Sequence, residues 1–199
     1  MRTRAAISAV ATRQAGVTLI ETLMAVSLGT FAAGALLTAV SSTVQVSTTS
    51  LQTAIAAGLA DQLMDEIAAV KFPPSSSTSG SSGSGARTAF TDLDAYNGYS
   101  ASPPLTREGL PIGTEGLSTS GAAMSRPTQF QPNRQLLGHY RQQVAVETVT
   151  DSGGTQWVTA SQSTTLRRVT VTISYTDAKG VTTSLAVQTR VFSNVAAAP

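Results

Sequence analysis

The hydrophobic and polar positions divide the chain into stretches with different periods. An apolar run extends from Val17 to Val40, and as a helix it would be about 36 Å long, enough to cross a hydrocarbon core of about 30 Å. After it, apolar residues recur every fourth position, which is typical of a helix that packs on one side. From Tyr140 they recur every second position, which is typical of strands.

The period of four predicts that the helix continues beyond Val40. It is expected to end before the prolines at 73 and 74, because the residue before a proline is pushed out of the α region. A helix over residues 17–70 would be about 81 Å long. Three acids, Asp61, Asp65 and Glu66, fall on or near its other face and predict a solvated surface. The expected apolar stripe consists of Leu51, Ile55, Leu59, Leu63 and Ile67.

The period of two predicts two hairpins, closed by turns at residues 151–154 and 177–180, and therefore an antiparallel sheet of about four strands. The clearest strand is residues 166–176, followed by a partner strand that begins near residue 181. The first of these strands is expected to face inward through Val169, Val171, Ile173 and Tyr175. The partner strand is expected to face inward through Val181, Leu185, Val187 and Val191, and outward through Ser184, Gln188 and Arg190.

Between helix and sheet, residues 73–137 show no sustained period. Residues 75–85 are Ser and Gly with one Thr, which is typical of a flexible linker. Asp92 and Asp94 precede Asn97-Gly98 and weakly resemble a calcium loop, but the register differs by one residue and no later bidentate acid follows. Asx turns explain the same residues, so calcium binding near the two aspartates stays open.

Composition removes several function classes. The chain has no cysteine and a single histidine, His139. Cysteine-ligated metal sites are therefore excluded, and a histidine-based catalytic triad has only this one residue available. Arg167 and Arg168 are expected at a strand end and on a solvated side rather than at an anion site. We expect that the protein is not an enzyme and that it binds no metal and no cofactor. The basic residues form no cluster, which argues against a nucleic-acid partner.

The charges are distributed unevenly. Residues 1–16 contain Arg2, Arg4 and Arg13 and no acid, whereas residues 22–60 contain no charge. Without the first sixteen residues the chain has ten basic and eleven acidic residues, a formal charge of −1. By the positive-inside rule, the arginines predict that the N-terminus is cytoplasmic. The apolar run predicts a single membrane span.

Glu21 interrupts the apolar run. A carboxylate at the centre of a spanning helix costs about 2.5–3.5 kcal/mol, and less near its end. A cation would offset that cost, and cleavage between Gly16 and Val17 would create one, a charged α-amine.

The stretch Gly16-Val17-Thr18-Leu19-Ile20-Glu21, with a basic leader before it and an apolar helix after it, resembles the class III signal of type IV pilins and pseudopilins. The resemblance implies cleavage after Gly16 by a prepilin peptidase and N-methylation of Val17. It also implies that Glu21 pairs with the α-amine of a neighbouring subunit.

Three features depart from the family pattern. Val17 replaces the phenylalanine that is usual at the first mature position, and Thr38 replaces a proline that is frequent in major pilins. No cysteine pair is present to close a C-terminal disulfide loop. These features favour a minor pilin or a minor pseudopilin of type II secretion, and the sequence does not separate the two.

The expected protein is a pilin-like α+β structural subunit. It would enter the inner membrane with its N-terminus in the cytoplasm and then join an extracellular pilus or a periplasmic pseudopilus, with other pilins and an assembly platform as partners. Two alternatives stay open: an uncleaved membrane-anchored binding protein or adhesin, and a secreted protein cut near Leu37-Thr38-Ala39. The expected divisions are a leader at 1–16, an assembly helix at 17–40, an amphipathic helix at 41–72, a linker and loop region at 73–137 and a sheet at 138–199.

Overall fold

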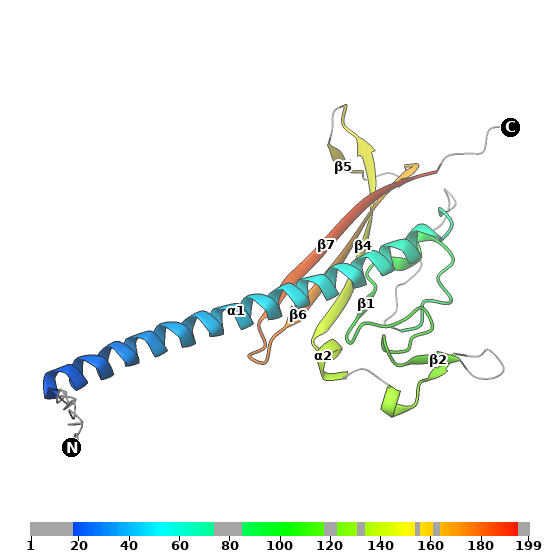
Figure 1. The fold of residues 1–199 in the computed structure, drawn as a ribbon. Helices are drawn as coiled ribbons and strands as arrows, with labels where there is room; N and C mark the ends of the chain where they lie inside the picture. Colours follow the sequence, from blue (N-terminus) through cyan, green and yellow to red (C-terminus); the bar gives the residue numbers. More distant parts are fainter. Residues whose placement is uncertain are drawn as a thin grey trace, which may run out of the picture. The chain divides into compact units, whose positions relative to one another are not determined.

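The computed structural model describes residues 18–73, 85–117, 123–130, 134–153, 156–160 and 164–194. Its contacts divide the chain into two units, residues 1–48 and 49–199. The predicted α+β class is confirmed, because the later turns of a long apolar helix share a core with an antiparallel sheet of about five strands (Figure 1). The predicted cleavage site, Gly16 and Val17, and most of the predicted linker lie outside the described residues.

Helix α1 comprises Leu19–Ala68. The predicted stripe is confirmed at Leu59, Leu63 and Ile67, which are buried, and Ile55 is half-buried. Leu51 is 57% exposed, so its assignment to the stripe was wrong. The Tyr140 hydroxyl, at the first residue of one of the two twelve-residue strands of the sheet, donates to Gln52 O at 3.5 Å, so α1 passes the end of that strand near Leu51.

The sheet has the order β1-β4-β6-β7, and β5 pairs with the far end of β4. All pairings are antiparallel. The strand β1, which pairs with β4, was not predicted because two residues are too short to show a period. The bounds are β1 Ser100–Ala101, β4 Tyr140–Asp151, β5 Trp157–Thr159, β6 Leu166–Thr176 and β7 Thr182–Ser193.

The prediction for β6 is confirmed at Val169, Val171 and Ile173, which are buried. The prediction for β7 is confirmed at Leu185, which is half-buried and packs against the core. It was wrong for Val187, Gln188 and Arg190, because a register shift between Ile173 and Ser174 changes which residues of β7 face the helix. The residues of β7 opposite the inward side chains of β6 are Ala186, Gln188, Arg190 and Phe192, whereas Val181 and Val187 are more than half exposed.

The segment predicted as a loop region folds into short elements and contributes to the core. Leu93, Tyr96 and Tyr99 are buried in the same cluster as Leu63 of α1 and Val171 of β6. Burial of one large apolar side chain stabilises the fold by about 1.5–3 kcal/mol, so this segment is an integral part of the second unit. Its elements and the short helix after it are η1 Leu93–Tyr96, β2 Glu115–Leu117, β3 Ala123–Ser125, η2 Thr128–Phe130 and α2 Arg134–Gly138.

Candidate functional site

The first described part of α1 exposes its apolar side chains. No residue between Thr18 and Thr48 is buried, and Ser27 alone among them is half-buried. Because apolar residues occur on every side, no single packing face is defined. The large exposed side chains of this part are Leu19, Ile20, Leu23, Met24, Val26, Leu28, Phe31, Leu36, Leu37, Val40, Val44 and Val46.

Hydroxyl groups in this part of the helix donate to the helix's own carbonyl oxygens. Thr22 donates to Leu19 O and Thr38 to Gly34 O, at 2.8 and 2.9 Å. Further donors of the same kind are Ser27, Thr30, Thr43 and Thr48. A hydroxyl that is satisfied within its own helix costs less to place in an apolar environment than a free one, so these polar residues are compatible with lipid or with other apolar helices.

Glu21 lies in the first turn of α1 and is exposed. Its backbone N–H donates to Thr18 O at 3.0 Å and lies 3.4 Å from the Thr18 hydroxyl, so Thr18 caps the helix start. Thr18 and Glu21 have the spacing of a capping box, and an acid in a first turn is stabilised by the helix dipole. The sequence interpretation missed this role, although the Thr-x-x-Glu spacing was available.

By length and composition, α1 is able to cross a membrane, and none of its most apolar stretch is buried. The absence of burial separates this stretch from the core helix of a globular protein, although a signal sequence would satisfy the same criteria. Within the part of the chain that the structure describes, the prediction of a helix long and apolar enough to span a membrane is therefore confirmed.

The second unit holds a buried charged cluster, formed by Glu66 of α1 with Arg87, Tyr96 and Tyr99. The Arg87 guanidinium donates to both Glu66 oxygens, at 3.0 and 2.7 Å, and also to the Tyr99 hydroxyl and Leu105 O. The Tyr96 hydroxyl donates to Glu66 at 2.9 Å. The side chains of Arg87 and Glu66 are only 3% and 15% exposed, so the predicted solvation of Glu66 was wrong.

The cluster shifts the pKa values of its members. Burial raises the pKa of Tyr96 and of Tyr99, and for Tyr96 the Glu66 carboxylate raises it further. Burial alone would lower the pKa of Arg87, but the hydrogen bond with Glu66 and the neighbouring Tyr99 leave it above its ordinary value. All three groups therefore keep their ordinary neutral-pH protonation states well into the alkaline range.

We expect stability to fall as pH rises above about 10, where tyrosines of the unfolded chain ionise. The folded state keeps Tyr96 and Tyr99 protonated. For each proton that only the folded state retains, the free energy of unfolding therefore falls by about 1.4 kcal/mol per pH unit. Urea unfolding in detergent at a series of alkaline pH values measures this slope, and Tyr96→Phe should make it shallower. A stability that stays constant up to pH 11 would contradict the assignment.

A second buried ion pair joins Arg167 to Asp94. Arg167 donates to both Asp94 oxygens, at 2.8 and 3.2 Å, and lies over the Phe72 ring. Arg167 is buried, so a solvated side was wrong for this residue, whereas its place at a strand end is confirmed because it is the second residue of β6. Asp92 caps η1 by accepting from Ala95 N–H at 3.0 Å. Both aspartates that suggested a calcium loop thus have protein partners, and the described residues contain no cluster of three metal-ligating side chains.

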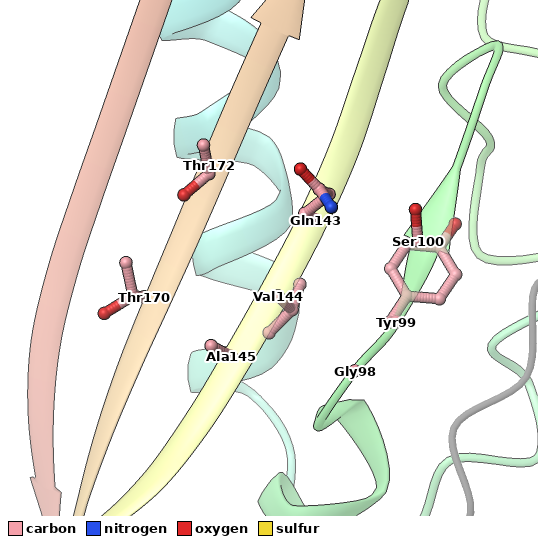
Figure 2. Close-up of a pocket in the computed structure, with 8 residues that line it drawn as sticks. All are labelled: Gly98, Tyr99, Ser100, Gln143, Val144, Ala145, Thr170 and Thr172. Carbon is pink, nitrogen blue, oxygen red and sulfur yellow. The ribbon is translucent and has the colours of Figure 1, made fainter. Parts of the chain in front are cut away.

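A shallow hollow lies on the face of the sheet away from α1. Its volume is about 280 Å³, and Figure 2 shows α1 behind the strands that form it. Its lining offers hydroxyl and amide groups and no charged side chain. Small-molecule sites commonly enclose about 300–1,000 Å³, so the hollow is small. The lining residues are Gly98, Tyr99, Ser100, Gln143, Val144, Ala145, Thr170 and Thr172.

Comparison with known proteins identifies no relative: no family model, no curated protein and no solved structure matches the chain.

Proposed function

We propose that this protein is a structural subunit, a minor pilin or a minor pseudopilin, that joins a helical filament through the apolar N-terminal half of α1. The role is structural rather than enzymatic. Cleavage after Gly16 removes the basic leader, and Val17 becomes the mature N-terminus.

The observation that carries the proposal is the contrast between the two units. Residues 49–199 bury their own core around α1 and the sheet, whereas the large apolar side chains of residues 19–46 are exposed. A contiguous exposed apolar surface of this extent marks an interface with lipid or with other chains. A filament subunit needs both environments in turn, first as a membrane protein and then as part of a helical bundle.

Glu21 supplies the specific contact. In an apolar bundle a lone carboxylate is costly, and an α-amine from Val17 of a neighbouring subunit is the matching cation. Pairing neutralises two charges that neither lipid nor the bundle tolerates singly. It also sets the axial offset between neighbours, since only one offset brings acid and amine together.

The proposal assigns the subunit to the inner membrane before assembly, with the leader in the cytoplasm and residues after Val40 across the membrane. Its partners are a prepilin peptidase, other pilins or pseudopilins and an inner-membrane assembly platform. After assembly it lies in an extracellular pilus or a periplasmic pseudopilus.

The proposed cleavage is tested by intact mass of the protein from the membrane fraction. We expect the wild-type chain to lack residues 1–16 and Gly16→Glu to retain them, because the peptidase of this family requires the glycine. Ala15→Ser is the matched control and should be processed normally. A wild-type protein that keeps its first sixteen residues would instead support an uncleaved membrane anchor, and one that lacks Val17–Val40 would support a secreted protein.

A further inference from the structure

The strand β7 leaves one edge of the sheet open. It lies at the end of the order β1-β4-β6-β7, and among the described strands only β6 pairs with it. Seven of its twelve residues are exposed and none is buried. By contrast, β1 and β5 cover parts of the other edge by pairing with the two ends of β4. Alternate N–H and C=O groups of β7 therefore point away from the sheet, and an extended chain is the structure that satisfies such a row.

The charges beside this edge define what such a chain would contain. On the helix side of the sheet, Asp61 accepts from Gln188 at 2.8 Å, and Asp65 lies 3.6 Å from Arg190. The Asp65 and Arg190 side chains are 71% and 45% exposed, so neither charge is enclosed. Two carboxylates against one guanidinium leave this side of the edge negative.

The opposite side of the edge carries the β-branched side chains of Val187, Thr189 and Val191. Val187 is 61% exposed and lies across from Thr172 of β6. β-branched side chains stabilise one another across neighbouring strands. A strand added at β7 would therefore place cations on the helix side and β-branched apolar residues on the outer side.

We infer that β7 is a strand-addition site for an extended segment of another protein, in which basic and β-branched residues alternate. A second copy of β7 does not meet this requirement, because it would bring Asp61 and Asp65 of one chain toward the same two acids of the other. Backbone hydrogen bonds supply the affinity in this mode of recognition, and side chains on the two faces supply the specificity.

Two synthetic ten-residue peptides test the inference on the full-length protein in non-ionic detergent, one alternating Lys and Val, the other Glu and Val. We expect the Lys/Val peptide to bind at least about tenfold more tightly by fluorescence anisotropy. Asp61→Asn combined with Asp65→Asn should reduce this preference to less than about threefold, whereas Glu108→Gln, which removes an exposed acid of the loop between β1 and β2, should leave it unchanged.

Hydrogen exchange locates the binding site independently. Backbone amides of β7 should gain protection when the Lys/Val peptide binds. Equal affinity for the two peptides, or protection that appears elsewhere while β7 amides exchange at their free rate, would overturn the inference. Because neither readout depends on residues 1–48, failure here would leave the proposed filament role untouched.

Discussion

Replacing Glu21 with alanine is expected to leave cleavage after Gly16 largely intact but to lower the amount of subunit recovered in filaments at least about tenfold. Removing one member of a buried charge pair costs about 3–5 kcal/mol, because the other charge stays unpaired in an apolar environment. In the membrane-bound subunit the same change removes a charge from the apolar run and should not impair insertion. The loss therefore appears at assembly, after processing is complete.

The measurement is the ratio of subunit in sheared filaments to subunit in the membrane fraction. Glu21→Gln keeps the size of the side chain and removes its charge, so it should behave like the alanine variant. Thr22→Ala alters the next residue of the same helical turn, where the hydroxyl donates only to Leu19 O, and should assemble normally. Normal filament content of the Glu21 variants would show that Glu21 does not pair with the α-amine of a neighbouring subunit. The proposed axial offset between neighbouring subunits would then lose its physical basis.

Replacing Arg87 with methionine is expected to destabilise the second unit by about 3–5 kcal/mol. The variant would leave Glu66 half-buried without its cation, and the Tyr99 hydroxyl and Leu105 O would each lose a hydrogen-bond donor. Methionine fills much of the volume of the arginine stem, so the expected loss comes mainly from the polar contacts rather than from a cavity.

Urea unfolding in detergent, followed by circular dichroism, measures this loss. Arg168→Met is the matched control, because Arg168 also pairs with an acid, Glu147, but both of those side chains are more exposed, and such pairs contribute only about 0–1 kcal/mol. Combining Arg87→Met with Glu66→Met should recover part of the loss, since no unpaired charge stays buried. A loss for Arg87→Met no larger than that for Arg168→Met would show that the cluster contributes little.

The charged cluster also explains why the segment around residues 87–101 forms part of the fold despite its irregular sequence. Arg87, Tyr96 and Tyr99 come from a stretch without hydrophobic periodicity, and each contacts Glu66 or another member of the cluster. This arrangement brings β1 to the start of β4. Long-range ion pairs and hydrogen bonds leave no periodic pattern in a sequence, so the cluster could not be predicted from it.

Local pattern determined the parts of this protein that depend on neighbouring residues. The period of four placed α1 and half of its buried residues, and the period of two placed β4, β6 and β7 with the two hairpin turns. The position of Glu21 in the apolar run was likewise evident from the chain alone, because charge and hydropathy are properties of each residue. These features carry the proposed assembly role.

Tertiary structure alone decided which side chains meet. The register shift opposite Ile173 and Ser174 turned Gln188 and Arg190 toward α1 and left Val187 exposed, because a change of one residue in pairing moves a strand's side chains to the other face. The burial of Glu66 and Arg167 followed from partners 21 and 73 residues away along the chain. Such contacts depend on how distant segments pack, and hydrophobic periodicity describes only the order of residues within each segment.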